Sequence, residues 1–187
     1  MKRYMLTSGF TLVELLFTLA IVAVITGLAA PAMDNLIQNN RRHTAVSDLI
    51  TMINLARYTA IMEQQTVTLC PLDKDKRCAT DWAGTITAFR DPESDKTLDH
   101  DNQIIRISQI PEGGYWTANT SSRPYFRFMP TGIANYAIGN MIWCPDNKDS
   151  TQASQLVVNR GGRVRLSKDN NGDGIVENAS GAPITCT

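Results

Sequence analysis

A cluster of basic side chains toward the end of the chain is the first feature that could do chemistry. Arg160, Arg163, Arg165 and Lys168 fall within nine residues that contain neither Asp nor Glu. If residues 163–166 form a strand, Arg163 and Arg165 project from one face about 7 Å apart, close to the phosphate repeat along one DNA strand. These side chains are candidates for binding double-stranded DNA, and ion pairs with Asp or Glu of the same or a neighbouring subunit are the alternative.

An acidic turn follows the basic cluster directly. Oxygen-bearing side chains occupy the first, third and fifth positions of a calcium-loop pattern, and glycine occupies the sixth: Asp169, Asn171, Asp173 and Gly174. The twelfth position is Ser180 instead of the usual Glu, although Glu177 offers a substitute ligand. We therefore predict a solvated turn, with calcium binding as the weaker alternative.

Catalysis has little support in the sequence. The chain has two histidines, His43 and His100, and it lacks a nucleophile elbow, a phosphate-binding loop and a metal-binding pair. We expect a structural or binding protein, with no enzymatic activity and no cofactor.

The composition limits what can position these residues. The chain has 187 residues, with 18 Lys and Arg against 18 Asp and Glu, and 43% of its residues are apolar. One modest folded domain fits this composition. A formal net charge near zero excludes a protein that binds nucleic acid through its overall charge, although a local basic patch remains compatible with it.

Charged and apolar residues are distributed most unevenly near the beginning of the sequence. From Phe10 to Met33 the only ionisable side chain is Glu14, and about 20 apolar residues suffice to cross a membrane. Lys2 and Arg3 precede this segment, so the positive-inside rule places the N-terminus in the cytoplasm. A secretory signal peptide is the alternative. It gives no reason for Glu14, because an unpaired carboxylate in an apolar helix costs about 2.5 to 3.5 kcal/mol.

The remaining sequence divides into a helix and a β-rich part. Apolar residues recur at three- and four-residue spacing from Val46 to Ile61, which predicts that one helix runs from about Phe10 to Gln65. Seven short β-rich runs separated by turn residues then predict an antiparallel sheet laid on the helix: 66–70, 85–89, 103–107, 125–129, 141–144, 155–159 and 163–166.

The residues Gly9-Phe10-Thr11-Leu12-Val13-Glu14 resemble the class III signal of type IV pilins and type II secretion pseudopilins. The resemblance implies that a prepilin peptidase cuts between Gly9 and Phe10 and that Phe10 is then N-methylated. It also implies that Glu14 pairs with the amino terminus of an adjacent subunit, so that two buried charges offset each other's desolvation.

Four cysteines in an exported chain predict two disulfides, for which three pairings exist. We choose Cys70–Cys78, which closes a short polar loop, and Cys144–Cys186, which tethers the C-terminal tail. Zinc is a poor alternative, because the spacings contain no C-x-x-C pair and no histidine stands close to a cysteine in the sequence.

Features spread over most of the chain resemble the GspH/FimT family of minor pilins and pseudopilins. They are the Cys70–Cys78 loop, Trp82 followed by Phe89-Arg90-Asp91, the segment 128–132, Cys144, and Gly162-Arg163-Val164-Arg165-Leu166 before a final Cys186. The turn Asp91-Pro92-Glu93-Ser94-Asp95 departs from the pattern of many relatives, which puts any special role of this turn in doubt.

The family resemblance implies an α+β, type IV pilin-like fold, in which a long N-terminal helix packs on a C-terminal antiparallel sheet domain. We expect a prepilin leader over 1–9, a transmembrane half of the helix over 10–33, an amphipathic half over 34–65 and a periplasmic β-rich domain over 66–187. The protein would be anchored in the inner membrane and assemble with other pilins.

Within the family, the basic cluster resembles the GRxR element that some FimT proteins use to capture DNA during natural transformation. The expected function is that of a minor pilin near the tip of a type IV pilus. A pseudopilin of the type II secretion system is the alternative.

Overall fold

The computed structural model describes residues 9–109, 112–120, 123–134 and 139–186, without the side chains of residues 30–32. Residues 1–8, most of the predicted leader, lie outside the described residues. The chain divides into two compact units, Met1–Ile37 and Gln38–Thr187, and helix α1 (Leu12–Met62) contributes to both.

The first unit consists of the N-terminal part of α1. Its apolar side chains are exposed, including Leu12, Phe17 and Val24. This helix is long and apolar enough to cross a membrane, and none of its most apolar 18-residue window is buried within the protein. An apolar helix exposed on every side is the pattern of a segment whose solvent is lipid or another protein.

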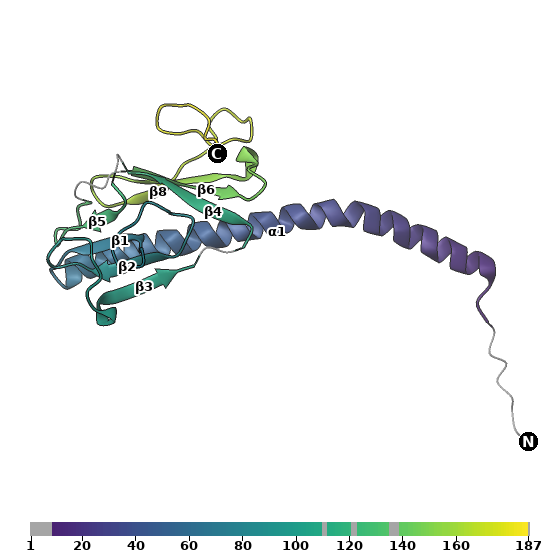
Figure 1. Ribbon diagram of the computed structural model, residues 1–187. Coiled ribbons are helices and arrows are strands. Elements are labelled where there is room, and N and C mark those ends of the chain that lie inside the picture. The colour runs from purple at the N-terminus through teal and green to yellow at the C-terminus, as the bar shows by residue number, and fades with distance from the viewer. Residues whose placement is uncertain (1–8, 110–111, 121–122, 135–138, 187) are drawn as a thin grey trace, which may run out of the picture. The chain divides into compact units, whose positions relative to one another are not determined.

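The second unit is built on the C-terminal part of α1, where the helix becomes amphipathic. One stripe of this part is buried, and its members recur at helical spacing: Ala45, Val46, Leu49, Met52, Ile53, Ala56 and Ala60. This stripe joins one hydrophobic core with side chains from both sheets, such as Phe126 and Trp143. Figure 1 shows the strands laid along this part of the helix.

In its described residues the β domain contains two antiparallel sheets of four strands each, where the sequence predicted one sheet. The first has the order β3-β2-β1-β5 and consists of Ile104–Ser108, Ile86–Arg90, Val67–Pro71 and Phe126–Phe128. The second has the order β4-β6-β7-β8 and consists of Gly114–Asn119, Gly139–Pro145, Ser154–Val158 and Val164–Leu166. Two short 3-10 helices, η1 (Asp101–Gln103) and η2 (Ser150–Gln152), precede β3 and β7. The general prediction of a long helix carrying antiparallel β structure is confirmed.

Polar contacts attach the first sheet to the helix. Asp48 of α1 accepts hydrogen bonds from Arg106 and Ser108 of β3, and it forms an ion pair with Arg106. At the end of α1, Glu63 forms an ion pair with Arg90 of β2, with 2.6 Å between Oε2 and Nε. This guanidinium lowers the pKa of the Glu63 carboxyl below its ordinary value.

Candidate functional site

The residues with a predicted role lie in separate places, and the first of them is the start of α1. Thr11 and Glu14 form reciprocal contacts: the Glu14 N–H donates to the Thr11 hydroxyl at 3.2 Å, and the Thr11 N–H donates to Glu14 Oε2 at 3.5 Å. This is a capping box, with Thr at the N-cap and Glu at the third helical position. The sequence analysis missed this pair, although the T-x-x-E spacing was a readable signal.

Glu14 is the acidic residue in the first turn of an otherwise apolar helix start, and its side chain is exposed. Within the part of the chain that the structure describes, Glu14 forms no ion pair with Lys, Arg or His. Its contacts with Thr11 satisfy a helix end but do not neutralise its charge. A cation from outside this chain would have direct access to it.

The basic cluster lies at the β7–β8 hairpin. Arg160 belongs to the turn, Arg163 precedes β8, Arg165 lies within it opposite Val157, and Lys168 follows it. Val164 packs against the core, so strand alternation places Arg163 and Arg165 on the side that faces away from it. All four basic side chains are exposed, and none forms an ion pair with any other described residue.

The hairpin turn is held in place by the rest of the domain. Gly162 has φ +72°, and a Cβ at this position would lie 2.2 Å from the carbonyl oxygen of Gly132. Arg57 of α1 donates to the same carbonyl at 2.9 Å, and the Ala134 N–H donates to the Arg160 carbonyl at 3.0 Å. The backbone that carries the arginines is therefore fixed, while their side chains remain free to meet a partner.

Two members of the basic cluster line a cleft of about 500 Å³. Arg165 and Lys168 line it together with Asn170 and Glu177, whereas Arg160 and Arg163 lie outside it. The four cations therefore do not line one concave site.

The acidic turn brings three carboxyl groups together. Oxygen atoms of Asp169, Asp173 and Glu177 lie within 4.8 Å of one another, and these residues are the one such group of His, Cys, Asp and Glu among the described residues. The N–H groups of Gly172 and Gly174 donate to Asp169 and hold the pKa of its carboxyl below its ordinary value. His43 on α1 and His100 before η1 are exposed and belong to no such group within the described chain.

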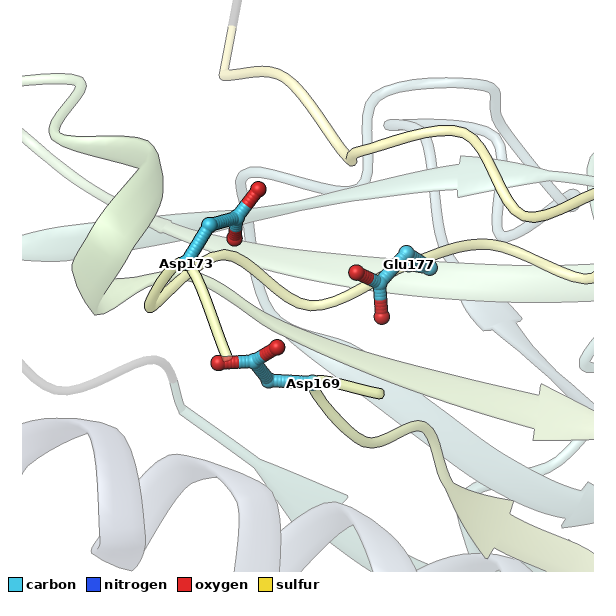
Figure 2. Close-up of side chains that lie close together, drawn as sticks. All are labelled: Asp169, Asp173 and Glu177. Atoms are coloured by element: carbon cyan, nitrogen blue, oxygen red, sulfur yellow. The ribbon is translucent and has the colours of Figure 1, made fainter. Parts of the chain in front are cut away.

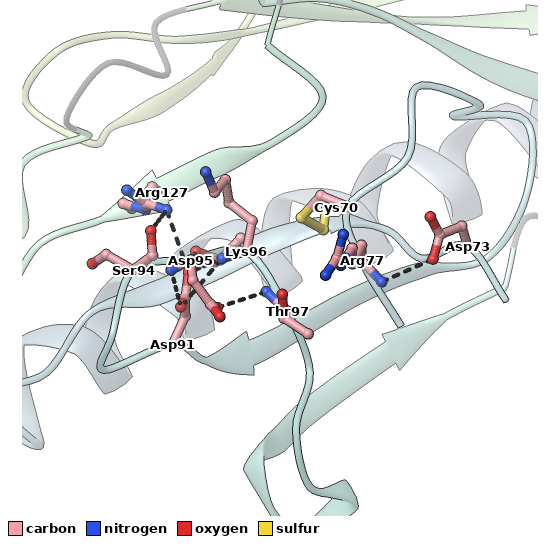
Figure 3. Close-up of a disulfide and its surroundings, with 11 residues drawn as sticks. Cys70, Asp73, Arg77, Asp91, Ser94, Asp95, Lys96, Thr97 and Arg127 are labelled. Carbon is pink, nitrogen blue, oxygen red and sulfur yellow. Dashed lines mark hydrogen bonds and ion pairs between the residues drawn. A yellow bond between two sulfur atoms is a disulfide. The ribbon is translucent and has the colours of Figure 1, made fainter. Parts of the chain in front are cut away.

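Both predicted disulfides are present. Cys70 is bonded to Cys78 and Cys144 to Cys186, with Cα atoms 5.5 and 5.6 Å apart. The first bond closes a loop in which Asp73 Oδ1 accepts the N–H of Arg77 at 2.9 Å (Figure 3). The second ties the chain that follows β8 to strand β6.

Asp91 belongs to the turn that departs from the pattern of many relatives, and in the structure it organises this turn after β2. Its carboxylate accepts hydrogen bonds from the Thr68 hydroxyl at 2.6 Å and from the Asp95 N–H at 3.0 Å. It also forms an ion pair with Arg127 of β5 at 3.4 Å, and Arg127 donates to the Ser94 carbonyl at 2.7 Å (Figure 3). The Asp91–Arg127 pair is thus a buried ionic joint that links the turn after β2 to β1 and β5.

The long apolar helix carrying an antiparallel β domain defines a pilin-like subunit. A family model described as type II transport protein GspH matches residues 45–162, and the chain belongs to this family. It is a GspH/FimT-like minor pilin or pseudopilin, as the sequence resemblance implied.

Solved structures show the same fold. Two crystal forms of the type IV minor pilin FimU of Pseudomonas aeruginosa PAO1 match with TM-scores of 0.57 and 0.52 and identities of 18% and 17%. The alignments cover 79% and 78% of this chain and 96% and 99% of FimU. The minor pseudopilin EpsH of Vibrio cholerae matches with a TM-score of 0.49 and 13% identity over 67% of this chain and 95% of EpsH. No curated protein matches the sequence.

Proposed function

We propose that this protein is a minor pilin of a type IV pilus, assembled near the tip of the fibre. Residues 10–33 hold it in the inner membrane with the β domain in the periplasm. Prepilin peptidase then cuts between Gly9 and Phe10, Phe10 is N-methylated, and the subunit joins other pilins. The observation that carries this proposal is Glu14, an exposed charge with no cationic partner among the described residues, at the head of a helix whose most apolar 18-residue window is unburied.

Glu14 provides an assembly contact for a physical reason. When the apolar helix is buried among neighbouring helices, its carboxylate needs a positive partner, because an unpaired buried charge is strongly unfavourable. The amino terminus of the adjacent subunit offers this charge. Pairing of the two groups also fixes the axial position of one subunit against the next.

The test separates the charge of Glu14 from its capping role. Gln also completes a capping box, so Glu14→Gln removes the charge while keeping the helix start. In a host that lacks the native gene, we expect the Glu14→Gln variant to reach the membrane in normal amounts. Its amount in sheared surface fibres should be lower than that of the wild type by about tenfold or more. Asp34→Asn, a matched change on an exposed residue of the same helix, should assemble like the wild type. Normal assembly of Glu14→Gln would refute the role.

The alternative is a pseudopilin of the type II secretion system, which requires the same membrane segment and the same Glu14 contact. Gene deletion distinguishes the two. Loss of twitching and transformation with normal protein secretion supports the pilus. Loss of exoprotein release with normal pili overturns the pilus assignment and supports the secretion machine.

Binding of double-stranded DNA is a second function, favoured by the exposed and unpaired state of the basic cluster in the described structure. Guanidinium groups that contact phosphates give little sequence preference and a strong dependence on salt. Each phosphate contact contributes about 0.9 to the slope of log K against log salt concentration. Loss of Arg163 and Arg165 should therefore reduce this slope by about 1.8.

Titration of DNA into the full-length chain in detergent micelles, at several salt concentrations, tests this second function. The Arg163→Gln/Arg165→Gln variant should bind more weakly and with the smaller slope. Lys74→Gln/Lys148→Gln removes the same charge from two other exposed positions and should behave like the wild type. Absence of binding by the wild type at low salt, or equal loss in both variants, would overturn the DNA site and leave the assembly function untouched.

A further inference from the structure

The chain between β8 and Cys186 brings three acidic side chains together. Figure 2 shows the Glu177 carboxyl group directed toward those of Asp169 and Asp173. Their oxygen atoms come within 4.8 Å of one another. Asp169 and Asp173 are exposed, whereas Glu177 is only 5% exposed. We propose that this loop binds a calcium ion.

Glu177 is the observation that separates this loop from an ordinary acidic turn. Its Oε2 atom accepts hydrogen bonds from the Asn170 N–H at 2.8 Å and from the Asn170 side-chain amide at 3.3 Å. Its Oε1 atom is buried and has no hydrogen-bond partner among the described residues. A buried carboxylate oxygen without a partner carries a desolvation cost, and two further carboxylates nearby increase it. A bound cation removes both costs.

Neighbouring basic side chains do not fill this role. Arg165 and Lys168 line the same cleft as Glu177, but neither forms an ion pair with Glu177, Asp169 or Asp173 within the described structure. The loop therefore keeps three negative charges that are not neutralised by direct contact.

The ligand set selects calcium over other metals. Asp169, Asn171 and Asp173 occupy the first, third and fifth positions of the loop pattern, and the carbonyl of Ile175 occupies the seventh. Glu177 at the ninth position supplies the carboxylate that Ser180 cannot supply at the twelfth. All these ligands are hard oxygen atoms, whereas zinc and copper prefer nitrogen and sulfur. Calcium also accepts irregular sets of six to eight oxygen atoms, while magnesium requires a compact octahedron.

Calcium at this loop would fix the tail of the domain. The loop is attached at its far side, where the Ile184 N–H donates to the Val176 carbonyl at 2.9 Å and Cys186 is bonded to Cys144. At its near side it continues directly from β8. An ion held by residues 169–177 joins these two attachments, so its binding should raise the thermal stability of the folded domain.

The experiment uses the full-length chain in detergent micelles, freed of metal with a chelator that is then removed. Titration with CaCl₂ should show one ion per chain with a Kd of about 1 mM or lower, the range of extracellular calcium modules. At a concentration about 100-fold above Kd, the Tm should rise by about 5 °C or more. MgCl₂ should bind at least about tenfold more weakly.

Two variants test the assigned ligands. Asp169→Asn/Asp173→Asn should weaken calcium binding at least about tenfold, and Glu177→Gln should do so while removing only the buried charge. Glu93→Gln/Asp99→Asn removes two exposed charges elsewhere and should bind like the wild type. Circular dichroism in the absence of calcium verifies that each variant is folded. Absence of saturable binding below about 10 mM, equal affinity for magnesium, or unchanged binding by the Asp169→Asn/Asp173→Asn variant would overturn the proposal.

Discussion

Replacing Asp91 should destabilise the domain more than replacing any other acid of the same turn. Its side chain is 1% exposed, and its partner Arg127 is 12% exposed. Asp91→Ala removes the ion pair and also leaves the Thr68 hydroxyl and the Asp95 N–H without their acceptor. Breaking a buried ion pair by removing one partner costs about 3 to 5 kcal/mol, because the other charge stays buried without compensation.

The isosteric variant Asp91→Asn separates the cost of losing the charge from the cost of losing the hydrogen-bond acceptors. Asp91→Asn keeps one acceptor oxygen and the shape of the side chain but removes the charge. Hydrogen bonds to charged groups contribute about 1.5 to 3 kcal/mol and neutral ones about 0.5 to 1.5 kcal/mol. We therefore expect Asp91→Asn to lower the free energy of unfolding by about half as much as Asp91→Ala.

Urea unfolding measures both effects, and Trp82, Trp116 and Trp143 report it because all three are buried. Asp95→Ala is the matched control: Asp95 lies in the same turn but is exposed, and it accepts one hydrogen bond from the Thr97 N–H. It should cost less than about 1 kcal/mol. An Asp91→Ala variant within about 1 kcal/mol of the wild type would refute the assignment of Asp91 as a buried ionic joint.

Three further changes test other contacts that hold the domain. Gly162→Ala should lower the free energy of unfolding by more than the roughly 1 to 3 kcal/mol that a positive φ alone costs, because its Cβ would meet a backbone oxygen. Gly181→Ala is the control for backbone strain without a clash, since Gly181 has φ +81° and no atom near its Cβ position. Equal urea midpoints for the two variants would contradict the clash at Gly162. Replacing Cys144 and Cys186 should lower the free energy of unfolding by about 4 kcal/mol, and replacing Cys70 and Cys78 by about 2.5 kcal/mol. The difference follows from the sequence separations of 42 and 8 residues, because a longer cross-linked loop restricts the unfolded chain more. The reverse order in urea unfolding would exclude this account. The lowered pKa of Glu63 means that its ion pair with Arg90 stabilises the fold fully above the ordinary carboxyl pKa of 4.5 and loses this effect as the pH falls through the lowered pKa. Arg90→Gln should lower stability by about 0.2 to 1 kcal/mol at pH 7, and this loss should shrink as acid protonates Glu63. A loss that stays constant down to the acid unfolding of the domain would be inconsistent with an ion pair.

The helix and most strands were predictable because their signals are local. The apolar period predicted α1 to about Gln65, and the helix ends at Met62. Strand β4 was missed, because its sequence Gly-Tyr-Trp-Thr-Ala-Asn begins with the second glycine of a Gly113-Gly114 pair and carries a weak local signal. In the structure β4 pairs with β6 along its whole length, from Gly114 opposite Pro145 to Asn119 opposite Asn140. This distant pairing, not intrinsic propensity, makes it a strand and creates the second sheet.

The candidate sites show the same difference between features with a local sequence signal and features that depend on distant contacts. The basic cluster and the presence of two disulfides were readable from residue types, whereas the cysteine pairing was a choice among three that the structure confirms. The contact of Arg57 with the carbonyl of Gly132 joins residues 75 positions apart, and the ion pair of Asp91 with Arg127 joins residues 36 positions apart. No local pattern indicates such partners, since they depend on which strands become neighbours. The burial of Glu177 is likewise set by the tail as a whole.

The residues that hold this fold are distinct from those that face its partners. Asp91, Gly162 and the cysteines fix the backbone through buried contacts, whereas Glu14 and the hairpin arginines are exposed. Changes at exposed positions without such contacts usually alter stability by less than about 0.5 kcal/mol. A loss of assembly in Glu14→Gln, or of DNA binding in the arginine variant, would therefore report a lost contact with a partner rather than an unfolded domain. Glu177 is the exception, because its side chain is buried and is also an assigned calcium ligand. A loss of calcium binding in Glu177→Gln is therefore interpreted only together with the circular dichroism control for folding.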